Sequence, residues 1–163
     1  MVLFFKNLLF TLIVPGSFAV YLPLLIAGSR PLVMDLASGI GCLLILLGAS
    51  IYAWCVWDFA TFGRRTPAPI DAPTKLIVRG LYRYTRNPIY TGVLTAILGW
   101  AMLFGAFELV QYAVVVGAFF QLLIVFFEEP ELRAEFGSEY ERYCAHVGRW
   151  LPRLPARPER PGG

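Results

Sequence analysis

Long apolar tracts alternate along the chain with short segments that carry most of its charge. The apolar tracts cover approximately residues 2–27, 35–62, 88–105 and 107–127. Each is long enough to cross the hydrocarbon core of a bilayer as a helix. Charged residues gather instead in segments 64–86 and 128–160. This pattern predicts an all-α integral membrane protein with about four transmembrane helices.

The first tract resembles a secretory signal peptide in position but not in length. It runs past 20 residues without an A-x-A-like exit, so we expect a retained helix that accommodates Pro15 and Pro23. The second tract is rich in small residues, which let helices approach closely. The connection between the third and fourth tracts, at "GAFE", is so short that these tracts should form an antiparallel hairpin.

The character of the sequence changes after Phe127, at "EEPELRAEFGSEYERYCAHVGRWLP". Pro130 suits a first helical turn, and the acidic residues around it complement a helix N-terminus. Apolar and aromatic side chains recur at helical spacing at Leu132, Phe136, Tyr140 and Tyr143. We therefore expect a cytoplasmic amphipathic helix that lies on the membrane face. Residues 1–152 are interpreted as one domain, and the proline-rich residues 153–163 as a disordered tail.

Composition supports the membrane interpretation. Hydrophobic residues make up 58% and charged residues 15% of the chain, below the roughly 25% charged residues of soluble proteins. The net charge of +3 arises beside the apolar tracts, where membrane orientation and anionic lipid explain it better than nucleic acid does. Three cysteines without C-x-x-C spacing and a single histidine predict no metal site.

The distribution of lysine and arginine predicts the orientation in the membrane. Six basic residues lie between the second and third tracts and six more follow the fourth, whereas the opposite loops hold only Arg30. The positive-inside rule therefore places both basic segments and both termini in the cytoplasm, a parity that four spans satisfy. We expect a protein of the bacterial inner membrane with its site on the cytoplasmic side.

Two carboxylates, Glu128 and Glu129, close the fourth tract. Helix C-termini favour cations, so this pair opposes the dipole of the helix that it ends. Either the pair caps the following helix, or it belongs to a polar binding site at the membrane boundary.

The stretch "RNPIYTG" (residues 86–92) opens the third tract. Asn87 is a favoured N-cap and Pro88 a favoured first helical residue, which leaves the amides of the first turn available to an anion. Gly92 either admits a ligand close to this turn or serves helix packing together with Ala96.

The predicted hairpin returns residues 88 and 128 to the same membrane surface. Carboxylates then face a helix N-terminus, which suits a ligand that carries both an ammonium and a carboxylate. Tyr82, Tyr84 and Tyr90 suit a flat ring or a cation, although tyrosines are common at membrane interfaces anyway. The residues predict a zwitterionic, partly aromatic ligand.

These residues resemble the isoprenylcysteine carboxyl methyltransferase and phospholipid methyltransferase superfamily of membrane enzymes. The family block G-x-Y-x-x-x-R-[HN]-P-x-Y-x-G occurs within "LIVRGLYRYTRNPIYTG", and the E-E pair followed by F-G-x-x-Y occurs within "EEPELRAEFGSEY". The similarity covers roughly residues 60–152. It implies S-adenosylmethionine as cofactor and a lipophilic acceptor, such as a prenylated or isoprenoid carboxylate, a phospholipid amine or a similar small molecule.

The resemblance also implies site residues. The positions that match cofactor contacts are Thr74, Lys75, Leu76, Ile77, Tyr82, Asn87, Pro88, Ile89, Tyr90, Gly92, Glu128 and Glu129. Asn87 stands where many members have histidine. Ile124 stands where the prenylcysteine enzymes have an arginine that meets the substrate carboxylate, and Arg149 is a candidate to substitute for it. Arg149, Glu129 and Tyr90 are the candidate catalytic residues that orient the acceptor.

The implied reaction is in-line transfer of a methyl group from a sulfonium to a nucleophile, for which the protein supplies geometry and removes water. A lipophilic acceptor would arrive laterally from the bilayer. Two alternatives are a non-enzymatic membrane scaffold of the same fold and a sterol-reductase-like enzyme that uses NADPH. Sterol reductases are considerably longer, which argues against the second.

Overall fold

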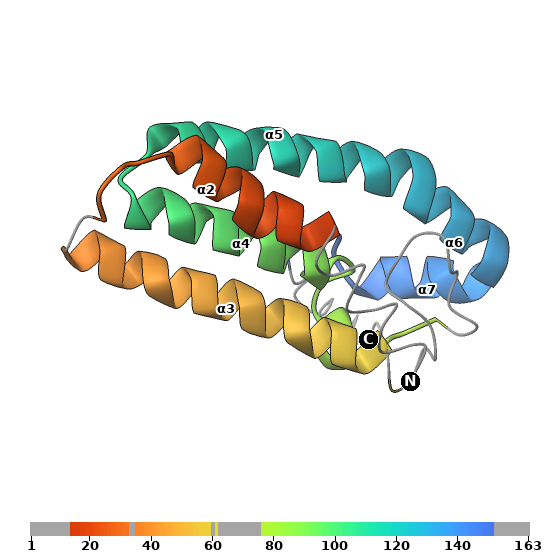
Figure 1. Cartoon of the computed structure of the whole chain (residues 1–163). Helices are drawn as coiled ribbons and strands as arrows, with labels where there is room; N and C mark the ends of the chain where they lie inside the picture. The colour runs from red at the N-terminus through yellow and green to blue at the C-terminus, as the bar shows by residue number, and fades with distance from the viewer. Residues whose placement is uncertain (1–13, 33–34, 60, 62–75, 152–163) are drawn as a thin grey trace, which may run out of the picture.

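The computed structural model describes residues 14–32, 35–59, 61 and 76–151. In chain order the elements are η1 (Ser17–Tyr21), α2 (Leu22–Ala27), α3 (Leu36–Asp58), η3 (Gly80–Arg83), α4 (Pro88–Leu103), α5 (Phe107–Leu123), η4 (Ile124–Glu128), α6 (Glu129–Phe136) and α7 (Ser138–His146). The elements η1 and η4 are π-helical and η3 is a 3-10 helix. The predicted all-α class is confirmed for the described part of the chain (Figure 1).

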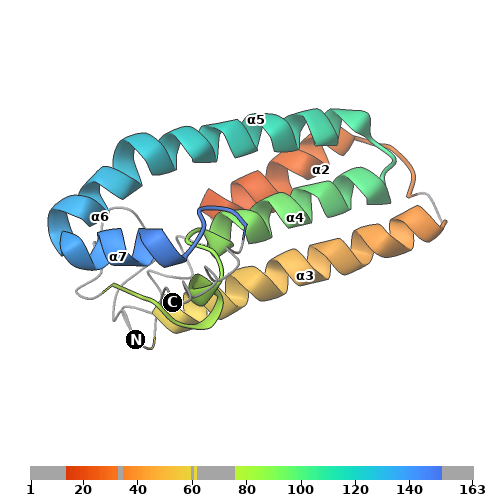
Figure 2. The same ribbon diagram turned by 180° about the vertical axis from the view of Figure 1, so that it is seen from behind.

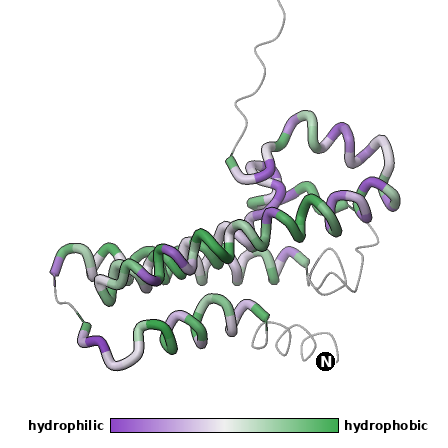
Figure 3. The backbone as a smooth tube through the Cα atoms, turned by 90° about the horizontal axis from the view of Figure 1, so that it is seen from above, coloured by the Kyte–Doolittle hydropathy of each residue, from purple (hydrophilic) through white to green (hydrophobic). Residues whose placement is uncertain are grey.

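Two of the described helices are long and apolar enough to cross a membrane. They are α3 and the continuous helix Phe107–Phe136, which α5, η4 and α6 form together. Val14–Ala27 and Pro88–Leu103 are apolar but shorter, so two of the about four predicted spans correspond to described helices that are long and apolar enough to cross a membrane. Many large hydrophobic side chains on α3 and α5 are exposed, a surface suited to lipid. Hydrophilic positions concentrate at the end of the bundle that carries α6 and α7 (Figure 3).

The helices α3 and α4 pack closely against each other (Figure 1). The contact runs along a line of glycines. A Cβ atom on Gly48 would lie 2.4 Å from the carbonyl oxygen of Gly92, and one on Gly41 would lie 2.7 Å from that of Gly99. Side chains at these positions would separate the two backbones, so the small residues determine the helix spacing. The start of α3 is fixed by Asp35, whose side chain accepts a hydrogen bond of 2.8 Å from the amide of Ser38.

The predicted antiparallel hairpin of α4 and α5 is confirmed (Figure 2). Gly105 turns the chain with φ +57°, and the amide of Ala106 bonds the carbonyl of Ala101 at 2.9 Å. A core of Val93, Ile97, Ala113, Val116 and Phe120 lies between the two helices. The hairpin therefore brings the start of α4 and the end of α5 to the same end of the bundle.

The segment that precedes α3 is tied to this hairpin through the backbone of η1. Trp100 donates a hydrogen bond of 2.8 Å to the carbonyl of Ala19, and the Tyr112 hydroxyl donates one of 3.1 Å to the carbonyl of Phe18. The regular hydrogen-bond pattern of an α-helix is interrupted in a π-helical segment. The Trp100 and Tyr112 side chains bond two of the carbonyls in this segment.

The C-terminal part differs from the prediction of a single amphipathic helix that begins near Pro130. The helix of α5 does not end at Phe127 but continues through the π-helical η4 to Phe136. Gly137, with φ +48°, then reverses the chain into α7, which runs back toward the start of α4 (Figures 1 and 2). The four residues predicted at helical spacing, Leu132, Phe136, Tyr140 and Tyr143, nevertheless belong to one hydrophobic cluster that spans this turn.

Candidate functional site

A cavity of about 70 Å³ lies where the start of α4, the π-helical η4 and α7 meet. It is lined by Phe59, Leu76, Ile77, Tyr82, Arg86, Asn87, Ile124, Glu128, Glu129, Leu132, Tyr140 and Tyr143. Six of these residues were predicted from the sequence as cofactor contacts: Leu76, Ile77, Tyr82, Asn87, Glu128 and Glu129. The predicted contacts Thr74 and Lys75 lie outside the described residues.

The two neighbouring glutamates have different environments. Glu128 is half-buried and accepts a hydrogen bond from the hydroxyl of Tyr90. The ring of Tyr90 packs on Phe120 with centroids 4.4 Å apart, so the hydroxyl is held in place. No arginine or lysine among the described residues forms an ion pair with Glu128, so its carboxylate faces the cavity without a cationic partner.

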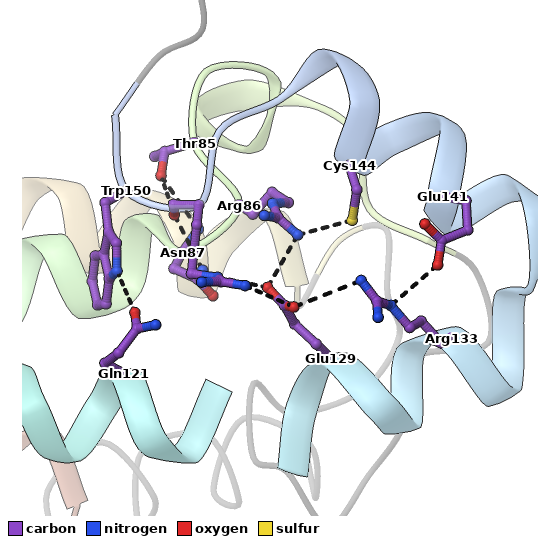
Figure 4. A network of polar contacts seen from close by, with 10 residues as sticks. Thr85, Arg86, Asn87, Gln121, Glu129, Arg133, Glu141, Cys144 and Trp150 are labelled. Atoms are coloured by element: carbon purple, nitrogen blue, oxygen red, sulfur yellow. Dashed lines mark hydrogen bonds and ion pairs between the residues drawn. The ribbon is translucent and has the colours of Figure 1, made fainter. Parts of the chain in front are cut away.

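Glu129, by contrast, is surrounded by an arginine cluster, which we define as Arg86, Arg133 and Arg149 (Figure 4). Its Oε1 accepts from Arg149 Nε at 2.7 Å and from Arg86 Nη1 at 3.1 Å, while Oε2 accepts from Arg149 Nη2 at 3.0 Å. Arg133 lies farther away, at 3.9 Å. Glu129 is 6% exposed, so this is a buried, fully paired carboxylate.

The alternative that the acidic pair caps the following helix is wrong. Glu128 takes the position before α6, but its φ of −71° and ψ of −49° are helical and its side chain makes no capping hydrogen bond. The reason is that α6 continues the helix of α5, so no free N-terminus exists at this point. The π-helical turn of η4 instead brings Ile124, Glu128 and Glu129 to the same cavity.

Asn87 occupies the N-cap position of α4 as predicted, and Pro88 is in the first turn. The Asn87 side chain, however, does not cap the helix. Its Nδ2 donates a hydrogen bond of 3.1 Å to the carbonyl of Arg149, and only its backbone carbonyl joins the helix, by accepting from Thr91. The side chain therefore connects α4 to the C-terminal segment.

The C-terminal arm, which we define as residues 138–151, is attached to the segment before α4 by main-chain contacts. Thr85 and Gly148 form an isolated parallel bridge, in which the amide of Arg86 bonds the carbonyl of Gly148 at 2.9 Å. Farther on, the Trp150 side chain ties the arm to α5, because its Nε1 donates a hydrogen bond to Gln121 Oε1 at 2.7 Å.

The hydrogen bond from Arg149 to Glu129 raises the pKa of the Arg149 guanidinium, so this pair stays charged at physiological pH.

Two of the three tyrosines that line the cavity, Tyr82 and Tyr143, are linked to each other. The Tyr143 hydroxyl donates a hydrogen bond of 2.7 Å to the carbonyl of Tyr82, which links α7 to η3. Burial raises the pKa of both phenols above the ordinary value, so both stay neutral. Tyr84, the third member of the predicted aromatic set with Tyr82 and Tyr90, is 61% exposed and does not line the cavity.

Gly92 is not among the residues that line the cavity and faces α3. A Cβ atom there would lie 2.9 Å from the carbonyl oxygen of Gly48 and 3.0 Å from Ile51. Of the two alternatives for this glycine, helix packing describes the observed contact. The predicted contacts Pro88, Ile89 and Tyr90 belong to the first turn of α4 and are not among the residues that line the cavity.

Several lining residues were not predicted as site residues: Phe59, Arg86, Ile124, Leu132, Tyr140 and Tyr143. Arg86 precedes the predicted N-cap and could have been found from its place in "RNPIYTG". Tyr140 and Tyr143 gave a helical pattern, but it was interpreted as a membrane-facing stripe. Phe59 gave no local sequence pattern. Within the described residues, no group of three or more metal-ligating side chains comes together.

The fold and the site define a class: a helical protein with apolar helices of membrane-spanning length and a polar site at one end of the bundle. Residues 36–139, more than half of the chain, match the phospholipid methyltransferase family model. The chain belongs to this family, which confirms the resemblance seen in the sequence.

Individual relatives are similar over shorter parts. Probable protein-S-isoprenylcysteine O-methyltransferases of the indica and japonica subspecies of Oryza sativa are each 34% identical over 120 residues. This covers 71% of this chain and 61% of each relative. A protein-S-isoprenylcysteine O-methyltransferase of Schizosaccharomyces pombe is 36% identical over 81 residues, or 49% of this chain and 34% of that protein. No solved structure shows significant similarity to the chain.

Proposed function

We propose that this chain is a membrane methyltransferase that uses S-adenosylmethionine and transfers a methyl group to a lipophilic acceptor. The observation that carries the proposal is the Glu128 carboxylate, which lines the cavity and pairs with no cation of the described residues. A carboxylate in this environment favours a positively charged ligand, because a ligand cation supplies the missing counter-charge. Methyltransferases of this family take the methyl group from S-adenosylmethionine.

The residues around the cavity fit the amino-acid end of that cofactor. Its ammonium would lie on Glu128, and its carboxylate would lie on the amides of Ile89 and Tyr90, where the dipole of α4 favours an anion. The Asn87 side chain bonds the carbonyl of Arg149 and does not cap these amides, which leaves them to a ligand.

The size of the cavity limits what it encloses. Its volume of about 70 Å³ has room for a small polar group, well below the ~300 Å³ of pockets that enclose whole drug-sized ligands. We therefore assign only the amino-acid end of the cofactor to the enclosed part. The apolar side chains of Leu76 and Ile77 then border the remainder.

The sulfonium of S-adenosylmethionine supplies a methyl group that is already activated for displacement. The residues of this chain need to bind and orient the cofactor and the acceptor, and to exclude water from them. Tyr90 holds the Glu128 carboxylate through its hydroxyl, and Ile124, which is 1% exposed, keeps one side of the cavity dry. Tyr90 is thus proposed as a residue that positions the cofactor-binding carboxylate.

Two other candidate catalytic residues, Arg149 and Glu129, take a different role in this proposal. Arg149 uses Nε and Nη2 in the two-point ion pair with Glu129. In this proposal Arg149 is committed to Glu129 and does not take the place of the arginine that Ile124 replaces. We propose that this pair positions the C-terminal arm beside the cavity instead of contacting the acceptor.

The acceptor is proposed to be a lipophilic molecule, such as a prenylated or isoprenoid carboxylate, a phospholipid amine or a similar small molecule. The phospholipid methyltransferase family, the similarity to protein-S-isoprenylcysteine O-methyltransferases and the apolar wall at Ile124 and Leu132 support this class. A lipid-soluble acceptor also partitions into the bilayer around the exposed apolar helices.

Incubation with S-adenosylmethionine labelled in its methyl group, followed by lipid extraction, tests the proposal. Membranes that contain the protein should incorporate label into the lipid fraction, and membranes that contain the Glu128→Gln variant should incorporate far less. A folded protein that incorporates no label and binds no S-adenosylhomocysteine would support the alternative of a scaffold without chemistry.

A further inference from the structure

Asp58 is a buried carboxylate in the last residue of α3, outside the portion of the chain that the sequence motifs cover. It is 3% exposed, and its Oδ2 has no hydrogen-bond partner among the described residues. Burial of a carboxylate without full hydrogen bonding costs free energy. The burial of this carboxylate is therefore not explained by a gain in stability.

The neighbours of Asp58 come from the turn that begins η3. Arg79 Nε lies 3.6 Å from Asp58 Oδ1, and the Arg79 side chain is 48% exposed. Gly80 follows with φ +54°, and a Cβ atom on it would lie 2.2 Å from Asp58 Oδ2. The first glycine of the G-x-Y block is therefore needed here for two reasons: its backbone conformation and the close approach of this carboxylate.

This turn leads directly into the wall of the cavity. Tyr82, two residues after Gly80, is buried and lines the cavity, as does Phe59, which follows Asp58. The rings of Phe59 and Tyr82 meet edge to face with centroids 5.7 Å apart. The carbonyl of Tyr82 also accepts the hydrogen bond of Tyr143 from α7. A shift of η3 would therefore move both aromatic side chains at the cavity.

We propose that Asp58 is a positioning residue for the ligand site and acts through Arg79, Gly80 and Tyr82. Its charge attracts Arg79 and holds the turn against the last turn of α3, which places Tyr82 and Phe59 at the cavity. The end of α3 is thereby part of the functional unit. This inference rests on the proposed binding of S-adenosylmethionine at the same cavity.

The test compares Asp58→Asn with Asp35→Asn, the same substitution at the opposite end of the same helix. Asparagine caps helices as well as aspartate does, so Asp35→Asn should leave binding unchanged. Calorimetric titration of the detergent-solubilised proteins with S-adenosylhomocysteine measures affinity, and thermal unfolding measures stability. Asp58→Asn should weaken the affinity about tenfold, as expected when one ligand contact is misplaced. Its unfolding temperature should stay close to that of the wild type, because the cost of burying the Asp58 charge is removed while Arg79, which is 48% exposed, stays solvated after the Asp58 charge is lost.

Arg79→Gln provides a second variant on the partly exposed partner. If Asp58 acts through Arg79, this variant should also weaken binding. The loss of binding free energy in the double variant should then be smaller than the sum of the losses in the two single variants. Wild-type affinity in Asp58→Asn overturns the inference and leaves the proposed function standing. A loss of affinity that is accompanied by a lower unfolding temperature also overturns it, because Asp58 would then be a structural residue. A wild-type protein that binds no S-adenosylhomocysteine overturns both the inference and the proposed function.

Discussion

Arg149 and Glu129 form a two-point ion pair, with Nε and Nη2 donating to the two carboxylate oxygens at 2.7 and 3.0 Å. Its consequence is that two consecutive glutamates have separate roles. Glu129 is neutralised by arginines and fixes the C-terminal arm, whereas Glu128 is held by Tyr90 and faces the cavity. The π-helical turn of η4 makes this division possible, because it brings both side chains to the same cavity.

Substitution of Glu129 by glutamine should destabilise the protein. The change leaves Arg86, which is 9% exposed in its side chain, without its counter-charge. Loss of one partner of a buried ion pair costs about 3 kcal/mol or more. Thermal unfolding in detergent should show the loss, whereas the matched variant Glu135→Gln, at an exposed position of the same helix, should unfold like the wild type. Equal unfolding temperatures would contradict the structural role of Glu129.

Substitution of Tyr90 by phenylalanine removes the hydroxyl that donates to Glu128 and keeps the ring packed on Phe120. The affinity for S-adenosylhomocysteine should fall roughly three- to tenfold, in line with the loss of one hydrogen bond. Tyr84→Phe is the control, because Tyr84 is exposed and does not line the cavity. If both variants bind alike, Tyr90 does not position the carboxylate.

The glycine contact between α3 and α4 gives a prediction about stability alone. Gly48→Ala places a Cβ atom 2.4 Å from the carbonyl of Gly92, so the helices must separate and the unfolding temperature should fall. Gly39→Ala, on the same helix with nothing within 4 Å of its Cβ position, should be neutral or stabilising by up to about 1 kcal/mol. A Gly48→Ala variant as stable as Gly39→Ala would show that the two helices do not pack in this way.

The hydrogen bond between Trp150 and Gln121 ties the end of the C-terminal arm to α5. Gln121→Leu removes the acceptor and leaves the indole N–H unpaired, so the arm should detach more readily. Limited proteolysis should then cleave the arm at a higher rate than in the wild type. The control is Gln111→Leu, on the same helix at an exposed position. Equal cleavage rates would show that this bond does not hold the arm.

The larger features of the fold follow from sequence patterns, because they depend on local rules. The apolar tracts predicted the helices, and the short connection at Gly105 predicted the hairpin. The ordered motifs predicted six of the residues that line the cavity. The family resemblance supplied these positions, while charge and helix-capping rules explained why carboxylates should face the start of α4.

Other features could not be predicted because they depend on contacts between distant segments. Asn87 is a good N-cap by propensity, but its side chain donates a hydrogen bond to a carbonyl of the C-terminal arm instead of capping α4. Glu128 and Glu129 look equivalent in sequence, and only the positions of the arginine cluster separate them. Pro130 is typical of a helix start, but here it lies inside a continuous helix. It is placed in the first turn of α6, directly after the π-helical turn of η4.

The measurement that tests the proposed cofactor site most directly is calorimetric titration of Glu128→Gln and Glu139→Gln with S-adenosylhomocysteine. Glu139 is an exposed residue in the first turn of α7 and does not line the cavity. Loss of a charge-assisted contact at Glu128 should weaken binding about 10- to 100-fold, whereas Glu139→Gln should bind like the wild type. Equal affinities of the two variants would contradict the assignment of Glu128 as the carboxylate that binds the cofactor.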